Sequence, residues 1–212
     1  MQIINHYNQG DIAWLEDRAW CVSGTKLATV MAGEVAQNTL MYELIAEEIA
    51  PLEENYVTPA MQRGTDLEPE AIQLYEKITW LTVDQVWLIK RNDFHICSPD
   101  GIIYNEDWII DKAVEVKCLA AKKMLKYMVV DSFMDVKKIE KTYYWQVVNY
   151  FMTIDTLKEL SFFLYNPDIY DIEKQSYTIT VTRDELQEDI DKAFVRLAEF
   201  EQWVKSIKLK LK

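Results

Sequence analysis

Glycine, proline and cysteine are scarce in this chain of 212 residues, which contains five, five and three of them, respectively. So few glycines and prolines exclude a fibrous or disordered chain and disfavour a loop-rich all-β sandwich. Three scattered cysteines do not make a disulfide framework and fit a reducing compartment. No apolar run is long enough to span a bilayer, and the first residues lack the basic and apolar parts of a signal peptide. We therefore expect a cytoplasmic globular protein with no membrane partner.

Basic residues are also in the minority, since 23 Lys and Arg face 35 Asp and Glu and the formal net charge is -12. This acidity argues against a protein that coats nucleic acid by charge alone. The lysines nevertheless gather between Lys112 and Lys141, where eight of them face four acids. A solvated helix surface would explain such a run. A groove that binds a polyanion beside an acidic cation site would explain it too, and the composition does not choose.

Half of the residues are hydrophobic, which is enough for a buried core without metal ions or disulfides. Hydrophobic periodicity and end signals predict helices over residues 11–18, 24–31, 39–49, 60–77, 121–130, 139–153 and 183–207. Apolar and alternating runs predict strands over residues 81–90, 94–98, 102–104, 108–110, 113–117, 159–165 and 176–181. Pro69 predicts a kink or a restart in the fourth helix. The order of the elements indicates one α/β domain with an N-terminal helical part.

Three charged residues are predicted to meet at the ends of two neighbouring strands. Asp100 lies between Pro99 and Gly101, which we expect to form a tight turn that aims its carboxylate. Glu115 and Lys117 lie on one face of a later strand, and hairpin pairing would bring them to Asp100. Two carboxylates can hold Mg²⁺, and an adjacent ammonium can orient or deprotonate an attacking water. Each residue alone would more often be a turn acid or part of an exposed strand face, but the trio indicates metal-assisted hydrolysis of a phosphodiester.

Pro-Asp followed by Glu-Val-Lys at the ends of adjacent strands is the signature of PD-(D/E)XK nucleases. The blocks around it resemble those of the phage lambda exonuclease family, of the viral recombinase or alkaline exonuclease type. In chain order these blocks are Trp14 with Arg18, and residues 23–25, 63–71, 97–101, 115–118 and 144–150. Several blocks in the same order are more specific than the nuclease signature alone.

The resemblance covers most of the chain and implies a fold. That fold is restriction-endonuclease-like, an α/β class in which a mixed β-sheet core is flanked by helices. We expect a single nuclease domain over residues 1–212. Its parts would be a mainly helical region over residues 1–78, a catalytic sheet core over residues 79–182 and a C-terminal helix over residues 183–212.

The resemblance also implies the catalytic residues. Asp100 and Glu115 would be metal-binding carboxylates, with the carbonyl of Val116 as a further ligand. Lys117 would position the nucleophilic water, and Glu68 would be an additional acid that reaches the metal. The implied cofactor is Mg²⁺, or Mn²⁺, with two ions in each active site.

Four more residues resemble a pocket for the 5′-terminal phosphate of DNA, namely Arg18, Thr25, Ser98 and Gln146. A guanidinium, two hydroxyls and an amide can surround phosphate oxygens without a metal. Met61 aligns with an apolar wedge that splits the terminal base pair, although a core methionine would look the same in the sequence. The aromatic residues around Gln146 could stack on bases, but their helical spacing is more typical of a core.

The function that the resemblance implies is an Mg²⁺-dependent 5′-to-3′ exonuclease acting on linear double-stranded DNA. It would release 5′-mononucleotides from one strand and leave a 3′ single strand for recombination by strand annealing. The implied partners are linear double-stranded DNA ends, further copies in a homotrimer ring, and a single-strand annealing protein. The gene would belong to a phage or prophage in a bacterial host cell.

Two alternatives stay open on the residues alone. A PD-(D/E)XK endonuclease of restriction or repair type would use the same catalytic trio without recognising an end. A catalytically silent DNA-end-binding module would keep only the fold, and the intact trio argues against it.

Overall fold

A mixed sheet of four strands, in the order β4-β5-β6-β7, organises the fold. The computed structural model describes residues 1–5, 10–51 and 57–211. The strands are β1 (Gln2–Ile4), β2 (Leu88–Lys90), β3 (Ile96–Cys97), β4 (Gly101–Tyr104), β5 (Ile110–Cys118), β6 (Glu159–Tyr165) and β7 (Ser176–Thr182). The α-helices are α1 (Ile12–Arg18), α2 (Gly24–Val30), α3 (Glu34–Ile49), α4 (Pro59–Thr79), α5 (Ala121–Tyr127), α6 (Val136–Ile139), α7 (Lys141–Thr153) and α8 (Arg183–Lys210). Short 3₁₀ helices lie at Phe133–Asp135 and Ile172–Lys174.

Strand β5 lies between β4 and β6 in this sheet. β4 runs antiparallel to β5, and β7 runs antiparallel to β6. β5 and β6 are parallel, with Glu115 opposite Phe162. A parallel pair needs a long crossover connection, which α5, α6 and α7 supply. A smaller sheet of order β1-β2-β3 lies apart from these four strands.

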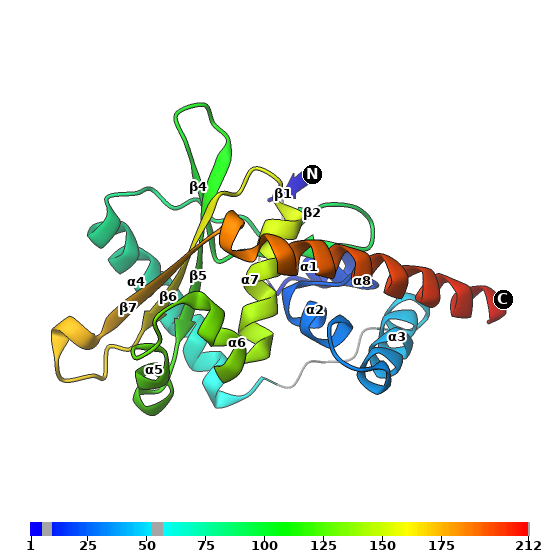
Figure 1. The fold of residues 1–212 in the computed structure, drawn as a ribbon, viewed down its shortest axis with the longest axis horizontal. Helices are drawn as coiled ribbons and strands as arrows, with labels where there is room; N and C mark the ends of the chain where they lie inside the picture. The colour runs from blue at the N-terminus through cyan, green and yellow to red at the C-terminus, as the bar shows by residue number, and fades with distance from the viewer. Residues whose placement is uncertain (6–9, 52–56, 212) are drawn as a thin grey trace.

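Helix α4 covers one face of the larger sheet and α7 covers the other (Figure 1). The smaller apolar cluster joins Tyr75 of α4 to Val114 and Val116 of β5. The larger cluster joins Ala113, whose side chain points to the opposite face of β5, to Val147 of α7. Because both faces are covered, β6 has an almost unbroken apolar sequence.

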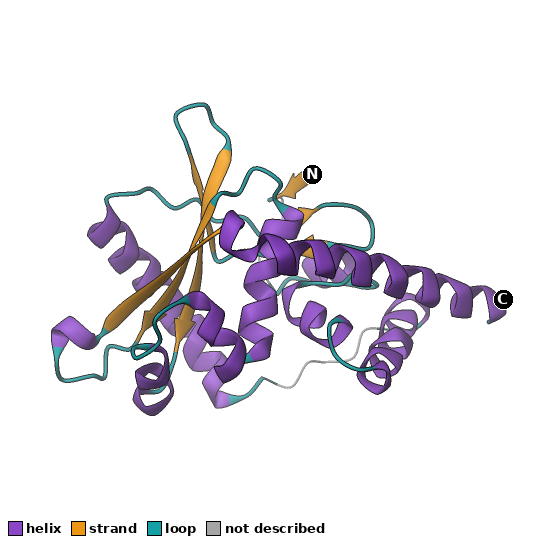
Figure 2. Ribbon diagram, in the orientation of Figure 1, coloured by secondary structure: helices purple, strands orange, loops and turns teal. Residues whose placement is uncertain are grey.

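The strands β4, β5, β6 and β7 gather on one side of the molecule, and α1, α2, α3 and much of α8 form a helical side next to them (Figure 2). Helix α8 begins at a capping box, in which Thr182 and Glu185 satisfy each other's backbone N–H groups. None of the helices in the described part of the chain is both long and apolar enough to cross a membrane.

Helix α4 runs without a break from Pro59 to Thr79, so the restart expected at Pro69 is wrong. Pro69 lacks the N–H that would bond to the carbonyl of Thr65. Thr65 is exposed, so water can satisfy that carbonyl and the helix continues. The start of the helix is fixed by Thr58, whose side chain accepts from the N–H of Met61 at 3.2 Å.

Several strand predictions also differ from the structure. Of the strand expected over residues 81–90, only Leu88–Lys90 belongs to β2, while Asp84 forms an isolated bridge with Ile102. The segments expected at 108–110 and 113–117 belong to one hairpin, whose tip holds Trp108 at a φ of 59° and whose second strand is β5. Strand β1 was not expected. Apolar character identifies a segment that can pair but not the partner that makes it a strand.

Candidate active site

Asp100 and Glu115 are brought together by the pairing of β4 with β5. Gly101 lies opposite Val114 in the antiparallel ladder, so Asp100 lies next to Glu115 at the start of β4. The backbone N–H of Val116 donates to Asp100 Oδ2 at 2.7 Å, which fixes the direction of this carboxylate. The hairpin that the sequence predicted is therefore the element that aligns the two acids.

Gly101 lies within β4 rather than in the tight turn expected from the sequence. Glycine is needed there because neighbouring side chains pack closely against its backbone. A Cβ atom at this position would lie 2.2 Å from Val83 Cγ1 and 2.9 Å from Val114 Cγ1. Any side chain would push β4 away from β5, and the Asp100 carboxylate would move with it.

Glu115 is fully buried, and both of its carboxylate oxygens have partners. Lys117 Nζ forms an ion pair with Oε1, and the Tyr150 hydroxyl donates to Oε2. Lys117 Nζ also lies 4.9 Å from the centre of the Tyr143 ring. An unpaired buried carboxylate would be costly, so these contacts stabilise Glu115 in the interior of the protein.

Asp100, Glu115, Glu68 and Lys117 form what we call the acidic cluster. The charges in this cluster influence one another's pKa values. Burial, followed by the charge of Glu115, raises the pKa of Asp100 well above its usual range. Burial, followed by the charge of Glu115, also raises the pKa of Glu68 on α4. Burial opposes the charge on Lys117, but Glu115 and Asp100 outweigh it and raise the pKa of that lysine. The acids repel each other, so an added cation would be favoured between them.

The donor set fits a hard divalent cation. No three His, Cys, Asp or Glu side chains among the described residues form a complete metal cage. Mg²⁺ needs no such cage, because it binds through one or two carboxylates and keeps several waters. Asp100, Glu115 and the Val116 carbonyl offer oxygen ligands of that kind. Burial raises the pKa of the neighbouring Cys118 to about 11, and a thiol is not among the oxygen ligands that Mg²⁺ prefers.

Two of the predicted phosphate-binding residues are in direct contact. Arg18 Nη1 donates to Ser98 Oγ at 2.5 Å, across a separation of 80 residues in the chain. The Arg18 guanidinium also lies 4.2 Å from the centre of the Trp14 ring, and Trp14 Nε1 donates to the carbonyl of Trp87 at 3.0 Å. The stacked ring and the serine hold the guanidinium plane in one orientation.

Gln146 and Thr25 approach the same region from two packed helices. Gln146 Nε2 donates to the Tyr150 hydroxyl at 3.5 Å, one helical turn further along α7. Gly24 allows α2 to approach this position, since a Cβ there would lie 2.9 Å from Gln146 Cγ. Thr25 follows directly and is exposed in the first turn of α2.

The remaining predicted residues lie on the surface. Met61 is exposed in the first turn of α4, so it is not part of the core. The lysine-rich window is not one uniform basic surface, because five of its lysines are in ion pairs: Lys112 with Glu159, Lys117 with Glu115, Lys123 with Glu140, Lys137 with Asp189 and Lys138 with Asp135. Lys122, Lys126 and Lys141 are exposed.

Sequence reasoning missed the importance of Tyr143 and Tyr150. They lie three residues before and four residues after Gln146, so all three share the face of α7 that meets β5. That spacing was a usable signal, but the tyrosines were considered only as core or base-stacking residues. Tyr144, Trp145 and Phe151 are buried, as expected for a core.

The fold and the paired acids define this chain as a structural relative of exonucleases. The alkaline exonuclease LHK-Exo from Laribacter hongkongensis matches with a TM-score of 0.74 and 26% identity, over 95% of this chain and 98% of that one. LHK-Exo in complex with dAMP gives the same values. A phage-related exonuclease from Haemophilus somnus shares the fold, with a TM-score of 0.69 and 16% identity over 91% of this chain and 96% of that one.

The family can be stated more closely. Residues 13–156 match the YqaJ-like viral recombinase domain, and the chain belongs to that family. No curated protein sequence gave a match. The family type and the mixed α/β fold with N-terminal helices, both expected from the sequence, are confirmed.

Proposed function

We propose that this chain is an Mg²⁺-dependent 5′-to-3′ exonuclease that digests one strand of linear double-stranded DNA to 5′-mononucleotides. The observation that carries the proposal is the position of Tyr150 between two groups of residues. Its hydroxyl donates to the Glu115 carboxylate in the acidic cluster. The same hydroxyl lies 3.1 Å from the carbonyl oxygen of Ser98, whose side chain contacts Arg18. A phosphate pocket joined to a hydrolytic centre suits an enzyme that starts at a strand end.

Each residue then has a distinct task. Asp100, Glu115, Glu68 and the Val116 carbonyl would hold the metal, which would supply Lewis acidity and a water of lowered pKa. Lys117, held by Glu115 and the Tyr143 ring, would donate hydrogen bonds that orient the attacking water.

The pocket residues would fix the strand end. Arg18 would offset the charge of the 5′-phosphate, and Thr25, Ser98 and Gln146 would bind its oxygens. Met61, exposed at the start of α4, would separate the terminal base pair.

Two comparisons support the substrate and the setting. The LHK-Exo complex contains dAMP, a nucleoside monophosphate of the kind that the proposed reaction releases. Membership of a viral recombinase family supports a role in recombination, in which the remaining 3′ single strand is annealed. We extend the proposal to a homotrimer ring with DNA in a central channel and a single-strand annealing partner. The exposed Lys122, Lys126 and Lys141 would line that channel.

The test compares linear duplex DNA with a covalently closed circle, in the presence of Mg²⁺. We expect the wild-type protein to degrade the linear DNA and to leave the circle intact. Lys117→Ala should reduce the rate by about a thousandfold, because the water loses its orienting group. Lys112→Ala is the matched control, since Lys112 lies on the same strand but pairs with Glu159 instead.

Cutting of the circle would show an endonuclease. DNA binding without any cutting would show a catalytically silent end-binding module. Equal activity of Lys117→Ala and wild type would contradict the catalytic role proposed for this site.

A further inference from the structure

The first half of α4 has few apolar contacts to hold it in place. None of residues 59–70, all of which are described, is buried, and the first buried side chain of the helix is Ala71. Gly64 and Pro69 weaken this half further, because glycine adds backbone freedom and proline removes a helical hydrogen bond. This half nevertheless carries Glu68, so polar contacts must fix its position.

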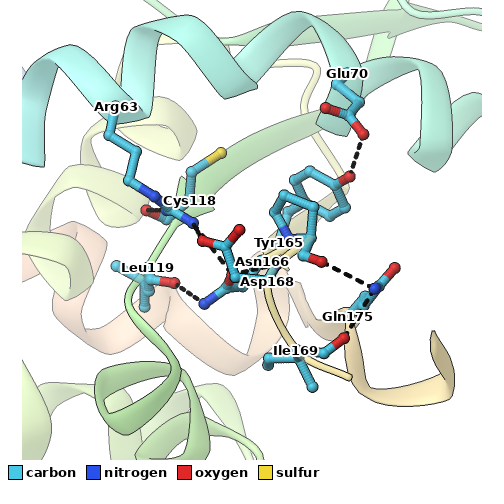
Figure 3. A network of polar contacts seen from close by, with 10 residues as sticks. Arg63, Glu70, Cys118, Leu119, Tyr165, Asn166, Asp168, Ile169 and Gln175 are labelled. Atoms are coloured by element: carbon cyan, nitrogen blue, oxygen red, sulfur yellow. Dashed lines mark hydrogen bonds and ion pairs between the residues drawn. The ribbon is translucent and has the colours of Figure 1, made fainter. Parts of the chain in front are cut away.

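Arg63 makes contacts that can do so (Figure 3). Its Nη1 donates to the carbonyl of Cys118 at 3.2 Å, and its Nη2 donates to Asn166 Oδ1 at 3.1 Å and to Asp168 Oδ2 at 2.7 Å. The planar guanidinium thereby joins α4 to the last residue of β5 and to the loop after β6. Cys118 directly follows Lys117, so the contact reaches the catalytic end of the strand.

The loop after β6 is well prepared to receive this guanidinium. Asn166 is only 2% exposed, and its Nδ2 donates to the carbonyl of Leu119 at 2.8 Å. Its Oδ1 accepts from the backbone N–H of Asp168 at 2.9 Å as well as from Arg63. Gln175 closes the loop by donating to the carbonyl of Ile169 at 2.8 Å (Figure 3). The Asn166 side chain is therefore held by contacts other than the one to Arg63.

A second tether lies on the other side of Glu68. The Tyr165 hydroxyl, at the end of β6, donates to Glu70 Oε1 at 2.5 Å. Glu68 thus lies between two polar attachments, five residues after Arg63 and two residues before Glu70. The attachment at Arg63 is the one that reaches the strand end carrying Lys117.

We propose that Arg63 is a positioning residue for the reaction, which holds Glu68 of α4 against the catalytic end of β5 through Cys118, Asn166 and Asp168. This inference rests on the proposed function. It differs from a purely structural role, because the Arg63–Asp168 pair is on the surface, where Asp168 is 77% exposed, and such pairs add little to stability. The effect on the reaction should therefore exceed the effect on folding.

Two measurements test this role in Arg63→Gln and Arg63→Lys. The first is hydrogen exchange of backbone amides in the metal-free protein, and the second is kcat and KM on linear duplex DNA at saturating Mg²⁺. In Arg63→Gln we expect faster exchange over residues 62–70 and a kcat about 10–100-fold lower, with KM for DNA ends unchanged. Arg63→Lys should recover part of the loss, because an ammonium can reach one acceptor but cannot form the fork.

The matched control is Arg183→Gln. Arg183 also bonds three carbonyl groups, those of Leu157, Phe151 and Ile154, but it does so at the start of α8. We expect this variant to lower thermal stability and to leave exchange over residues 62–70 and kcat per folded molecule unchanged. If Arg63→Gln does not fold, Asp168→Asn removes one charged acceptor at an exposed position and should give a smaller effect of the same sign.

The inference is overturned if exchange over residues 62–70 is the same in the Arg63 variants and the wild type. It is also overturned if kcat falls no further than in Arg183→Gln. If the wild-type protein digests no DNA, the proposed function fails on its own. Exchange that rises only over residues 62–70 then still supports the attachment of α4 by Arg63.

Discussion

The two helices on either side of the catalytic sheet are held in opposite ways. Helix α7 is buried along almost all of its length from Tyr144 to Thr153, whereas α4 buries only Ala71, Ile72 and Tyr75. The α7 side therefore holds its polar side chains inside a packed core. The α4 side holds Glu68 through a few polar contacts at its edge. One half of the candidate site is thus held by packing, and the other by a small number of specific hydrogen bonds.

Substitutions on the α7 side and on the α4 side of the sheet should therefore have different effects. Changes to buried polar groups near α7 should affect activity and stability together, because each buried group depends on its partner. Changes in the first half of α4 should affect activity more than stability, because little surface is buried there. Three substitutions and one pH series separate these expectations.

The largest effect is expected on the rigid side, for Tyr150→Phe. This change removes the hydroxyl that donates to Glu115 and lies 3.1 Å from the carbonyl oxygen of Ser98. We expect the rate on linear DNA to fall by about 10–100-fold. The free energy of unfolding should fall by about 1–3 kcal/mol, because a buried carboxylate loses a donor. Tyr144→Phe is the control, since the Tyr144 hydroxyl bonds Asp189 of α8 instead. Equal activity in the two variants would contradict the role of Tyr150.

A pair of glycine substitutions gives the next largest effect and compares the packed second half of α4 with its first half, because a Cβ at Gly101 would also lie 3.7 Å from Ile72 Cδ1. Gly101→Ala would place Cβ 2.2 Å from Val83 Cγ1, so unfolding free energy should fall by about 1–3 kcal/mol. Gly64→Ala meets no atom within 4 Å and lies in the middle of α4. It should raise stability by about 0.5–1 kcal/mol through helix propensity. Urea unfolding of both variants checks the signs, and a destabilised Gly64→Ala would mean that α4 is packed more closely than described.

The last effect is a pH dependence of stability on the α7 side. His95 is buried, with Nε2 2.7 Å from Asn149 Oδ1, and burial lowers its pKa from 6.5 to about 4. The unfolded chain therefore binds a proton on His95 between these pH values and the folded chain does not. Stability from this residue is present above pH 6.5 and is lost as the pH falls toward 4. Urea unfolding across this range should show a steeper loss in wild type than in His95→Gln, and parallel curves would contradict a neutral buried His95.

The sequence was sufficient to predict the strand that carries Glu115 and Lys117. Alternation along residues 113–117 places Glu115 and Lys117 on one face, and a hairpin is the simplest way to bring Asp100 beside them. Both features depend on local geometry, which is why a pattern of a few residues could reveal them. The helices at 141–153 and 183–210 could be predicted in the same way, because their apolar positions repeat with helical spacing.

The contacts of Arg63 could not be predicted in that way. Its acceptors Cys118 and Asp168 are 55 and 105 residues away in the chain, and no local pattern connects them. The role of Tyr150 was missed for another reason, because a buried aromatic residue on a helix looks like a core residue even where its spacing from Gln146 is a usable signal. Pro69 gave a misleading signal for a different reason, because an exposed turn tolerates the missing hydrogen bond.

The central claim is that a 5′-phosphate pocket delivers one strand end to the acidic cluster. Linear duplex DNA with a 5′-phosphate on one strand and an internal label on each strand tests it most directly. We predict that the wild-type protein converts the phosphorylated strand to mononucleotides with Mg²⁺, leaves the other strand intact, and loses this preference in Arg18→Ala. Loss of either strand from its 3′ end, or the release of internal fragments, would contradict the account.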